Sequence, residues 1–377
     1  MSQRILIVGG GMAGASLAWW LGQLGAGPRT TLLEREPLLG LHATGQNAAI
    51  LRTAVTPWAT RVLAEQTRQF LQNPPPGFAP APLLRRRGLL LAEGTHKDPL
   101  PLWLDDHLSW NSVQPLSRAR QHQLAPHFSP LGERCWWFPH QGEIDVALLL
   151  ERFAAGARKS GVRVETGREV TGWMRSGTSE PRVCGVRLAD GSQLEADVTV
   201  IAAGAWAPSL SSDLSGPVAM RVTRRHLMVS APTTTVAPDS PVVWDDQAGF
   251  YARPESAGLL MSACDLCDVE PDALRPDPDV QRLLAEKVER LLPHCGDLGL
   301  AHFWPGMRTL TDDDVPWIGP DSRCAGLFWL AGLGGHGISV GAAAGRVAAE
   351  QLCGHAIDDE LRAALDPGRQ VTLAVPL

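Results

Sequence analysis

The hydrophobic pattern of the first 36 residues predicts a strand, a helix and a second strand. Residues 4–10, RILIVGG, form a short apolar run that contains β-branched residues and ends in glycine, which is typical of a buried strand. Residues 12–27, MAGASLAWWLGQLGAG, are rich in alanine and leucine and end in glycines, which favours a helix. Residues 29–36, RTTLLERE, have the pattern of a second strand.

The turn between the first strand and the helix carries a spaced set of glycines. Gly9, Gly11 and Gly14 match G-x-G-x-x-G, and Glu34 lies 20 residues beyond Gly14. In this pattern the first glycine permits the turn, the second lets a pyrophosphate approach the backbone, and the third lets the helix pack on the strand. The helix N-terminus faces the phosphates, and the carboxylate of the acidic residue accepts hydrogen bonds from the ribose hydroxyls. We therefore expect a dinucleotide without a 2′-phosphate, whose charge Glu34 would repel.

Similar patterns recur along the rest of the chain. Residues 145–173 predict a helix followed by a strand, and residues 183–206 predict a hairpin that turns at Asp190 and Gly191, then a buried strand. Residues 242–263 favour paired strands and residues 277–295 an amphipathic helix. Residues 326–352 repeat the order of strand, glycine turn and small-residue helix, with the helix starting near Ile338.

Composition and charge exclude some classes of function. The chain has 377 residues, 44% of them apolar, which is enough for two lobes, and a net charge of −6 that gives no reason to expect a nucleic-acid partner. No uncharged apolar run reaches the roughly 18 residues of a membrane span, and we expect no signal peptide before the first strand. We expect a cytoplasmic protein; peripheral membrane contact stays open, although nothing indicates it.

Seven scattered cysteines add little chemistry. Cys264 and Cys267 form a CxxC pair, but no second pair or histidine partner follows at the spacing of zinc sites. We expect free thiols and no metal site, with a redox pair or half of a metal site as the alternatives. Free thiols fit a reducing cytoplasm.

The segment after Glu34 separates two classes of dinucleotide. Residues 35–52, REPLLGLHATGQNAAILR, are rich in small residues and offer backbone amides and polar side chains. A nicotinamide-binding domain would continue here with another βαβ crossover. An extended segment of small residues could instead follow a long cofactor such as FAD, and a surface loop is the alternative.

Taken together, these segments resemble the D-amino-acid oxidase/glycine oxidase superfamily of FAD-dependent oxidoreductases. The resemblance is carried by VGGGMAGASLAWWL, LLERE, HATGQNAAI, VIAAGAWAPSL, GMRTLTDDDVPWIGP and GLFWLAGLGGHGISVGAAAGRVAAEQL, which together span nearly the whole chain. Within the superfamily it is similar to bacterial D-arginine dehydrogenases, through residues 70–84 and 141–150 as well.

The resemblance implies an α/β fold with a discontinuous, Rossmann-like FAD-binding domain and an interleaved substrate domain built on a mixed β-sheet. The FAD-binding domain would comprise residues 1–82, 139–216 and 305–377, and the substrate domain residues 83–138 and 217–304. The proline-rich residues 73–82 would cross between the lobes.

FAD is expected to bind without a covalent link, because residues 306–314 lack the cysteine that tethers FAD in sarcosine-oxidase relatives. The FAD-binding residues that the resemblance implies are Gly9, Gly11, Met12, Ala13, Gly14, Glu34, Arg35, His42, Ala43, Thr44, Asn47, Ala48, Ala49, Val170, Ala203, Gly204, Gly306, Gly334, Gly335, His336, Gly337 and Ile338.

Three residues are implied to act on the substrate. Arg308 matches the family's carboxylate-binding arginine, whose planar fork donates two parallel hydrogen bonds; the alternative is an ion pair with one of the aspartates at 312–314. Tyr251, the only tyrosine, aligns with a tyrosine whose hydroxyl reaches the same carboxylate, unless it serves only packing. His336 is expected beside the flavin, against the substrate amine or as part of the wall.

The side-chain pocket is predicted from the same resemblance. Ile50, Val55 and Leu89 stand where the arginine-active relatives carry a histidine, a tyrosine and an acid, and without that acid a buried guanidinium would cost several kcal/mol. We therefore expect a substrate that is not cationic. The other expected wall residues are Trp206, Arg225, Met228 and Trp244, although core packing is the default for the two tryptophans and Met228. A structural salt bridge is favoured for each of Arg224, Arg225 and His226.

The expected reaction is FAD-dependent oxidation of a small or apolar α-amino acid of D configuration by hydride transfer to flavin N5. The imino acid formed would give a 2-oxo acid and ammonia with water, and electrons would pass to O₂ or to a quinone or dye-type acceptor. The alternatives are a secondary amine such as sarcosine, proline or a glycine-like substrate, a 2-hydroxy acid, a non-catalytic FAD protein, and a nicotinamide dehydrogenase.

Overall fold

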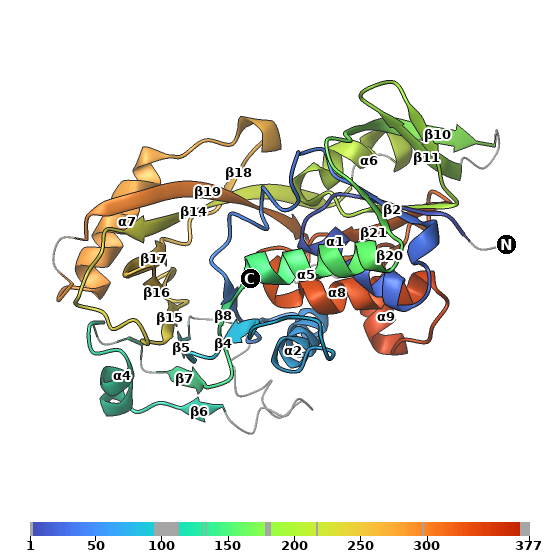
Figure 1. Cartoon of the computed structure of the whole chain (residues 1–377). Coiled ribbons are helices and arrows are strands. Elements are labelled where there is room, and N and C mark those ends of the chain that lie inside the picture. Colours follow the sequence, from blue (N-terminus) through green and yellow to red (C-terminus); the bar gives the residue numbers. More distant parts are fainter. Residues whose placement is uncertain are drawn as a thin grey trace.

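Two lobes, each built on its own sheet, make up the structure (Figure 1), a computed structural model that describes residues 3–93, 113–129, 131–132, 134–177, 182–215, 218–295 and 298–369. The first lobe has a six-stranded sheet of order β20-β21-β13-β1-β2-β9. All its neighbouring pairs are parallel except β20 with β21. The strand bounds are β1 (Ile5–Val8), β2 (Thr30–Leu33), β9 (Arg163–Glu165), β13 (Val198–Ile201), β20 (Trp317–Pro320) and β21 (Leu327–Ala331).

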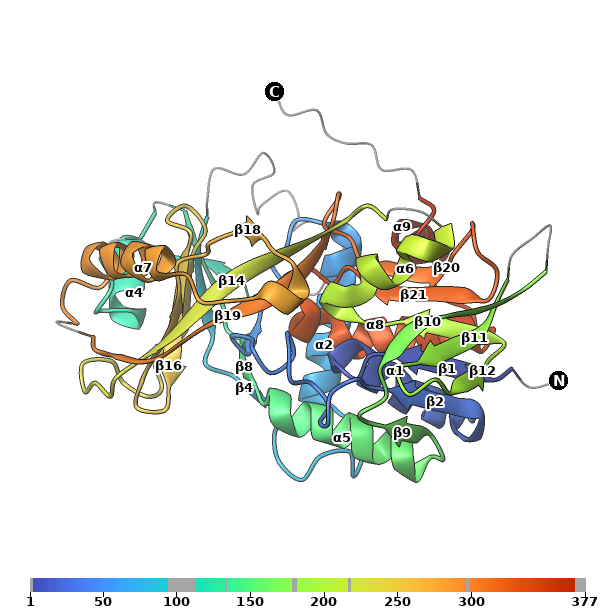
Figure 2. The same ribbon diagram turned by 90° about the horizontal axis from the view of Figure 1, so that it is seen from above.

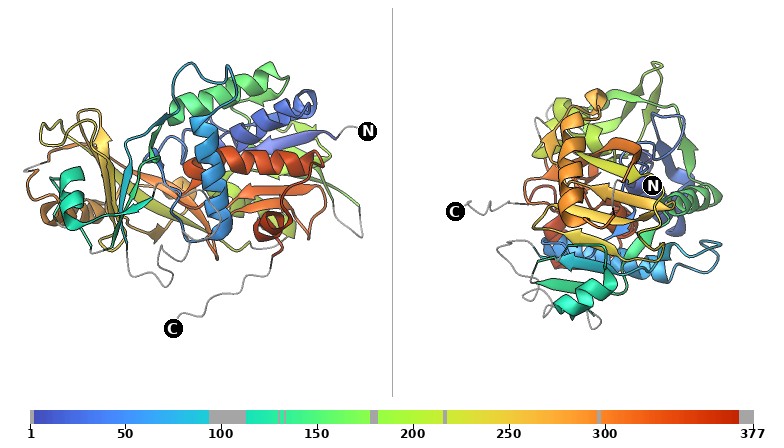
Figure 3. Two further views of the ribbon diagram at one scale, coloured as in Figure 1. Left: turned by 90° about the horizontal axis from the view of Figure 1, so that it is seen from below. Right: turned by 90° about the vertical axis from the view of Figure 1, so that its left-hand side faces the viewer.

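Helices cover one face of this sheet. Three of them, α1 (Met12–Gln23), α5 (Val146–Lys159) and α8 (Gly337–Leu352), lie side by side, and α2 (Trp58–Gln72) crosses them (Figure 3, left). Side chains alternate across β1: Ile5 and Ile7 pack with these helices, whereas Leu6 and Val8 pack on the opposite face. Buried on both faces, the strand reads as an unbroken apolar run.

The opposite face is covered by a small antiparallel sheet and a helix. The sheet contains β10 (Val170–Ser176), β11 (Arg182–Leu188) and β12 (Gln193–Glu195), and α6 (Ala207–Ser215) follows the short helix η2 (Gly204–Trp206). Figure 2 shows these elements beside β2 and β21. The predicted hairpin turn at Asp190 and Gly191 is confirmed, because Gly191 has φ +82° and its N–H donates to Leu188.

The second lobe has a nine-stranded mixed sheet in which β5 and β15 are parallel and the other neighbours antiparallel. Its outer face packs against α7 (Pro278–Leu291), while α4 (Arg118–Leu124) lies near its end. The strands are β5 (Leu89–Ala92), β6 (Gln114–Pro115), β7 (Cys135–Phe138), β14 (Met220–Ser230), β15 (Val242–Asp245), β16 (Phe250–Glu255), β17 (Gly258–Ser262), β18 (Cys267–Asp268) and β19 (Leu300–Thr311).

Two long strands join the lobes. β14 and β19 pair antiparallel from Met220 opposite Thr311 to Ser230 opposite Leu300, and they run from one lobe into the other (Figure 1). A third connection is a small sheet of β3 (Ile50–Leu51), β8 (Gly142–Ile144) and β4 (Leu84–Arg85). The remaining elements are α9 (Asp359–Leu365) and the short helices η1 (Gly27–Arg29) and η3 (Pro271–Ala273).

The predicted α/β class with two sheets is confirmed, whereas the pattern did not predict α2 or the small sheet of β3, β4 and β8. The exact domain division stays a prediction: the strands of each large sheet fall within its predicted segments, except that β19 crosses the boundary at residue 304. Among the described residues, no helix is both long enough and apolar enough to cross a bilayer.

Candidate active site

A cavity of about 410 Å³ opens between the two lobes. One wall comes from the segments that follow β1, β2, β13 and β21, where parallel strands end, and the other from β14, β15, β16 and β19. Ligands of open α/β sheets usually bind at this edge, because the loops that follow the carboxyl ends of the parallel strands form a crevice there. The lining runs from the glycine turn to the strand pair that joins the lobes.

The glycine turn leaves no room for side chains. Gly9 has φ +112°, and a β-carbon there would overlap the carbonyl oxygen of Ala202 at the end of β13. Gly14 does not line the cavity; its missing β-carbon lets α1 lie against the Gly9 carbonyl. The first and third glycines therefore fit the predicted roles of turn and helix packing.

Glu34 fixes this turn from the end of β2. Its Oε2 accepts a hydrogen bond of 2.7 Å from the Gly10 N–H, and its Oε1 accepts one of 2.9 Å from the Glu36 N–H. The carboxylate is buried in the cavity wall and each oxygen keeps a second lone pair for a ribose hydroxyl. Thr44 also reaches the turn, since its Oγ1 accepts from the Met12 N–H at 2.9 Å.

A cluster of side chains covers this end of the cavity. The Arg35 guanidinium lies 4.1 Å from the ring centroid of Trp206, and the His42 and Trp206 rings are 4.5 Å apart. Asp272, on η3 of the second lobe, accepts from Arg35 Nη2 at 3.2 Å and from Trp206 Nε1 at 3.1 Å. Trp206, predicted to be in the substrate pocket, therefore lies with Arg35 at the dinucleotide end.

Two arginines share one face of the β14–β19 pair. Thr223 lies opposite Arg308, and Arg225 lies opposite Gly306, so the two guanidinium groups are diagonal neighbours on the same side. Both line the cavity. Burial and the nearby positive charge of Arg225 lower the pKa of Arg308 to about 10, which leaves it charged at neutral pH.

Arg308 has no hydrogen-bonding or ion-pair partner in the part of the chain that the structure describes, so the alternative of a salt bridge with an aspartate at 312–314 does not occur there. Its guanidinium lies against the last glycine turn: a β-carbon on Gly335 would be only 2.7 Å from Arg308 Cζ. The group is therefore held beside the cavity with its donors available.

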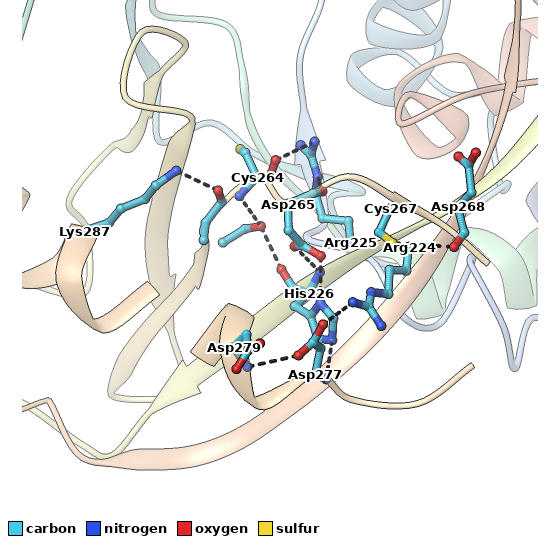
Figure 4. Close-up of polar contacts among 12 residues, drawn as sticks. Arg224, Arg225, His226, Cys264, Asp265, Cys267, Asp268, Asp277, Asp279 and Lys287 are labelled. Atoms are coloured by element: carbon cyan, nitrogen blue, oxygen red, sulfur yellow. Dashed lines mark hydrogen bonds and ion pairs between the residues drawn. The ribbon is translucent and has the colours of Figure 1, made fainter. Parts of the chain in front are cut away.

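The neighbours of Arg225 on β14 contact carboxylates, whereas Arg225 itself contacts main-chain carbonyls (Figure 4). Arg224 pairs with Asp277, which confirms the structural salt bridge predicted for it, whereas His226 Nδ1 contacts Asp265 Oδ2 at 2.8 Å as a hydrogen-bonding partner. The salt bridge favoured for Arg225 is not found among the residues that the structure describes. Its guanidinium donates to main-chain carbonyls and faces the cavity.

Tyr251 and Trp244 form an aromatic wall at the arginine end. Their rings stack 4.3 Å apart, on neighbouring positions of β15 and β16, and both line the cavity. Burial raises the pKa of Tyr251, so its hydroxyl keeps its proton at neutral pH and can donate.

His336 occupies the N-cap position of α8. Burial and the positive charges of Arg52, Arg308 and Arg225 lower the pKa of His336 to about 3. The ring lines the cavity as a neutral imidazole.

Arg52 is a cavity residue that sequence reasoning missed. Its guanidinium donates two hydrogen bonds to Asp246, of 3.2 and 2.7 Å, and lies 4.4 Å from the Trp244 ring centroid. The Trp244 Nε1 also donates to Asp246, at 2.7 Å. Nothing near Arg52 in the sequence indicates this partner on the other lobe.

Three predicted pocket residues lie elsewhere. Val55, Leu89 and Met228 are buried but do not line the cavity. Met228 packs in the core beneath α7, whereas Leu227 lines the cavity, because successive residues of β14 point to opposite faces. Leu89 is enclosed within its own sheet, where all four residues of β5 are buried.

The remaining predicted residues, Gly14 aside, line the cavity. At the cofactor wall they are Gly9, Gly11, Met12, Ala13, Glu34, Arg35, His42, Ala43, Thr44, Asn47, Ala48, Ala49, Val170, Ala203, Gly204, Gly306, Gly334, Gly335, His336, Gly337 and Ile338. At the substrate wall they are Ile50, Arg225, Trp244, Tyr251 and Arg308.

These residues fit a long anionic cofactor such as FAD. The first turns of α1 and α8 meet the cavity and carry no acidic residue, so their partial positive charges are available to phosphate and flavin oxygens. Gly204 has φ +52° with open space where a β-carbon would stand. The Gln46 Oε1 atom is buried beside the cavity without a partner.

The chain is similar to several known proteins. The chain is 26% identical to the D-amino acid dehydrogenase of Xylella fastidiosa (strain M23) in an alignment that covers 93% of this chain and 92% of that protein. It is 25% identical to the glycine oxidase of Pseudomonas aeruginosa over 374 residues, covering 94% and 96%. Its fold is similar to that of L-proline dehydrogenase from P. horikoshii, with a TM-score of 0.84, 17% identity and 97% of each chain covered.

The family model described as FAD dependent oxidoreductase, DAO, matches residues 4–351. That span includes the glycine turn, Glu34, Tyr251, Arg308 and the final glycine turn. The chain therefore belongs to the DAO family of FAD-dependent oxidoreductases.

Proposed function

We propose that the protein oxidises a small or apolar α-amino acid of D configuration to its imino acid, which water converts to a 2-oxo acid and ammonia. The observation that carries the proposal is the Arg308 guanidinium, charged, facing the cavity and without a partner among the described residues. A carboxylate is the group that best satisfies such a fork. When bound, FAD supplies the hydride acceptor, the N5 atom of the flavin.

In this proposal Arg308 and Arg225 bind the substrate carboxylate and Tyr251 donates a further hydrogen bond to it. All three line the cavity, and Tyr251 is 2% exposed, so a bound carboxylate would meet donors in a largely dry site. His336 is neutral and can accept from the substrate amine without placing a second positive charge beside it.

The side-chain preference follows from the charges of the cavity. Among the described residues, the acids that line it are Glu34, Glu169 and Asp272, and Glu34 and Asp272 belong to the dinucleotide end. At the arginine end Arg52 is already paired with Asp246. A cationic side chain would meet positive charge there without a free acid, at a cost of several kcal/mol. Ile50, Leu227 and Trp244 offer apolar walls instead.

The relatives named D-amino acid dehydrogenase and glycine oxidase support an amine substrate with a carboxylate. The glycine oxidase relative also supports the second candidate, a glycine-like or secondary amine substrate such as sarcosine or proline, because the same donors would hold its carboxylate. We propose O₂ or a quinone-type molecule as the electron acceptor, and the cytoplasm, which the free cysteines favour, as the location.

The test is anaerobic mixing of the holoprotein with D-amino, L-amino, N-methyl amino and 2-hydroxy acids, followed by the loss of flavin absorbance near about 450 nm. We expect small and apolar D-amino acids to bleach the flavin fastest. Bleaching by N-methyl acids alone would favour the second candidate, and no bleaching by any α-amino acid would contradict the proposal.

A variant tests the role of Arg308. Arg308→Ala should weaken apparent substrate affinity by about 10- to 100-fold, because it removes a charge-assisted hydrogen-bonding group. The matched control is Arg221→Ala, which removes an exposed arginine of β14 that pairs with Asp268. Unchanged turnover and affinity in Arg308→Ala would refute the assignment.

A further inference from the structure

Arg225 is held by main-chain oxygens. Its Nε donates to the Asp265 carbonyl at 3.0 Å and its Nη2 donates to the Cys264 carbonyl at 3.1 Å (Figure 4). A guanidinium has five N–H groups, so both Nη1 hydrogens and one on Nη2 remain available. Since Arg225 lines the cavity, the two carbonyls decide where those free donors point.

The backbone is strained where it presents these carbonyls. Cys264 has φ +52°, a left-handed conformation that is unfavourable for a non-glycine residue. Surrounding hydrogen bonds hold it there. The Ser262 hydroxyl donates to the His226 carbonyl at 2.7 Å and accepts from the Cys264 N–H at 3.2 Å, while Lys287 Nζ donates to the Ala263 carbonyl at 2.8 Å.

Asp265 completes the edge of β14. On this edge β17 pairs with β14 at Met228 and Val229, and β18 pairs at Thr223 and Arg224, which leaves a gap between them. The Asp265 carboxylate fills the gap: its Oδ1 accepts from the His226 N–H at 2.7 Å, and its Oδ2 contacts His226 Nδ1 at 2.8 Å. One residue thus binds His226 through its carboxylate and Arg225 through its carbonyl.

The protonation of the pair follows from its contacts. His226 is 1% exposed, and its Nε2 accepts from the Asp277 N–H at 3.0 Å, so the ring proton lies on Nδ1 and is donated to Asp265. Burial alone would raise the pKa of Asp265, but the hydrogen bonds from His226 and the charge of Arg225 lower it. The Asp265 carboxylate is therefore ionised and acts only as a hydrogen-bond acceptor.

We propose that Asp265 and His226 are positioning residues, which aim the Arg225 guanidinium at the substrate carboxylate and thereby set carboxylate affinity. This inference rests on the proposed function. Arg225 and His226 are adjacent on β14, and their side chains lie on opposite faces of the sheet. Asp265 connects them, because its carboxylate bonds His226 on one face and its main-chain carbonyl accepts from Arg225, which faces the cavity.

The test is Asp265→Asn in the holoprotein, with calorimetric titration of propionate, a carboxylate that has no amine to oxidise. An asparagine can still accept from the His226 N–H, but its NH₂ would face the Nδ1–H of a ring whose other nitrogen is already bonded. We expect the dissociation constant for propionate to rise about tenfold and KM to follow, while kcat at saturation and FAD content change by less than about twofold. Asp268→Asn, which alters the exposed pair with Arg221, is the control and should change none of these.

A double-mutant cycle separates positioning from general loosening. Arg225→Met alone should weaken propionate binding, and adding Asp265→Asn to it should have no further effect beyond about twofold. An equal loss from Asp265→Asn with and without Arg225 would overturn the proposal, as would no loss in the wild-type background. If Asp265→Asn yields no folded holoprotein, His226→Gln, which alters the other member of the pair, takes its place in the cycle, with the same outcomes.

The outcomes also distinguish this inference from the proposed function. Weaker binding in Arg225→Met with normal binding in Asp265→Asn would overturn the positioning role alone. Unchanged propionate binding in Arg225→Met would overturn both the positioning role and the assignment of Arg225 to the carboxylate site. Flavin bleaching by D-amino acids tests the reaction independently of either result.

Discussion

Gly14 packs directly on the Gly9 carbonyl, and a β-carbon at position 14 would overlap that oxygen. The contact brings the N-terminus of α1 against the end of β1, where Gly9 and Glu34 form the turn that faces the cavity. The third glycine of the motif therefore acts on the cofactor site through packing.

Gly14→Ala should separate α1 from the turn and weaken FAD binding. Overpacking of this kind costs about 1–3 kcal/mol of folding stability, and the shifted turn should lower the FAD content of the purified protein. The control is Gly299→Ala, where a β-carbon would make an ordinary 3.4 Å contact with Ala231. Absorbance near about 450 nm and the melting temperature check both variants. Full FAD content in Gly14→Ala would contradict the packing role.

Asp272→Ala should loosen the cluster over the dinucleotide end. The substitution removes the acceptor that Arg35 and Trp206 share across the two lobes. We expect the dissociation constant for FAD to rise about tenfold, with kcat unchanged at saturating FAD. Titration of the apoprotein with FAD, followed by fluorescence, measures this dissociation constant. Asp279→Asn, an exposed residue of α7 that pairs with Arg282, is the control and should bind FAD normally.

The pH dependence of flavin reduction should not report His336. Burial and three nearby arginines lower the pKa of His336 to about 3, below the ordinary 6.5, so the ring stays neutral above about pH 4. An acidic limb between about pH 5 and 9 should therefore belong to the substrate ammonium. His336→Asn should change the rate of reduction but keep the midpoint of the stopped-flow pH profile. Disappearance of the limb would show that the histidine titrates there.

Asp246→Asn should shift side-chain preference toward acidic substrates. The change weakens the pairing of Arg52, whose guanidinium already lines the cavity wall. We expect kcat/KM for D-glutamate relative to D-alanine to increase about tenfold, because a substrate carboxylate can then pair with Arg52. Asp313→Asn weakens a comparable pair with Arg369, which does not line the cavity, and is the matched control. An unchanged ratio would place the substrate side chain away from Arg52.

FAD should leave the protein on acid precipitation. Residues 306–314 contain no cysteine that could tether the flavin. The yellow colour is expected in the supernatant, measured by its absorbance near about 450 nm. Colour that stays in the pellet after washing would indicate a covalent link.

Local sequence was sufficient for the parts of the site that lie on short, continuous segments. The G-x-G-x-x-G turn, Glu34 and the last glycine turn are encoded within about one βαβ unit or one strand–helix turn, where spacing and residue type fix geometry. The resemblance supplied Arg308 and Tyr251, both of which line the cavity. Periodicity located strands such as β1, β2, β13 and β21 of the first sheet and β15, β16 and β17 of the second. The face to which each side chain points was harder to predict, because Leu227 lines the cavity and the predicted Met228 does not.

Sequence by itself thus determined the dinucleotide turn, because it depends on residues close together in the chain, and the fold class and kind of chemistry, because the resemblance rests on several short motifs, each recognisable locally. Only the tertiary structure decided how charge is distributed around the substrate. The Arg52–Asp246 pair joins residues 194 positions apart, and the carbonyls that hold Arg225 come from 39 and 40 positions away. The first contact forms where the two lobes meet at the cavity, and the second forms within the sheet of the second lobe. No local pattern of residues specifies which distant groups will meet in either place.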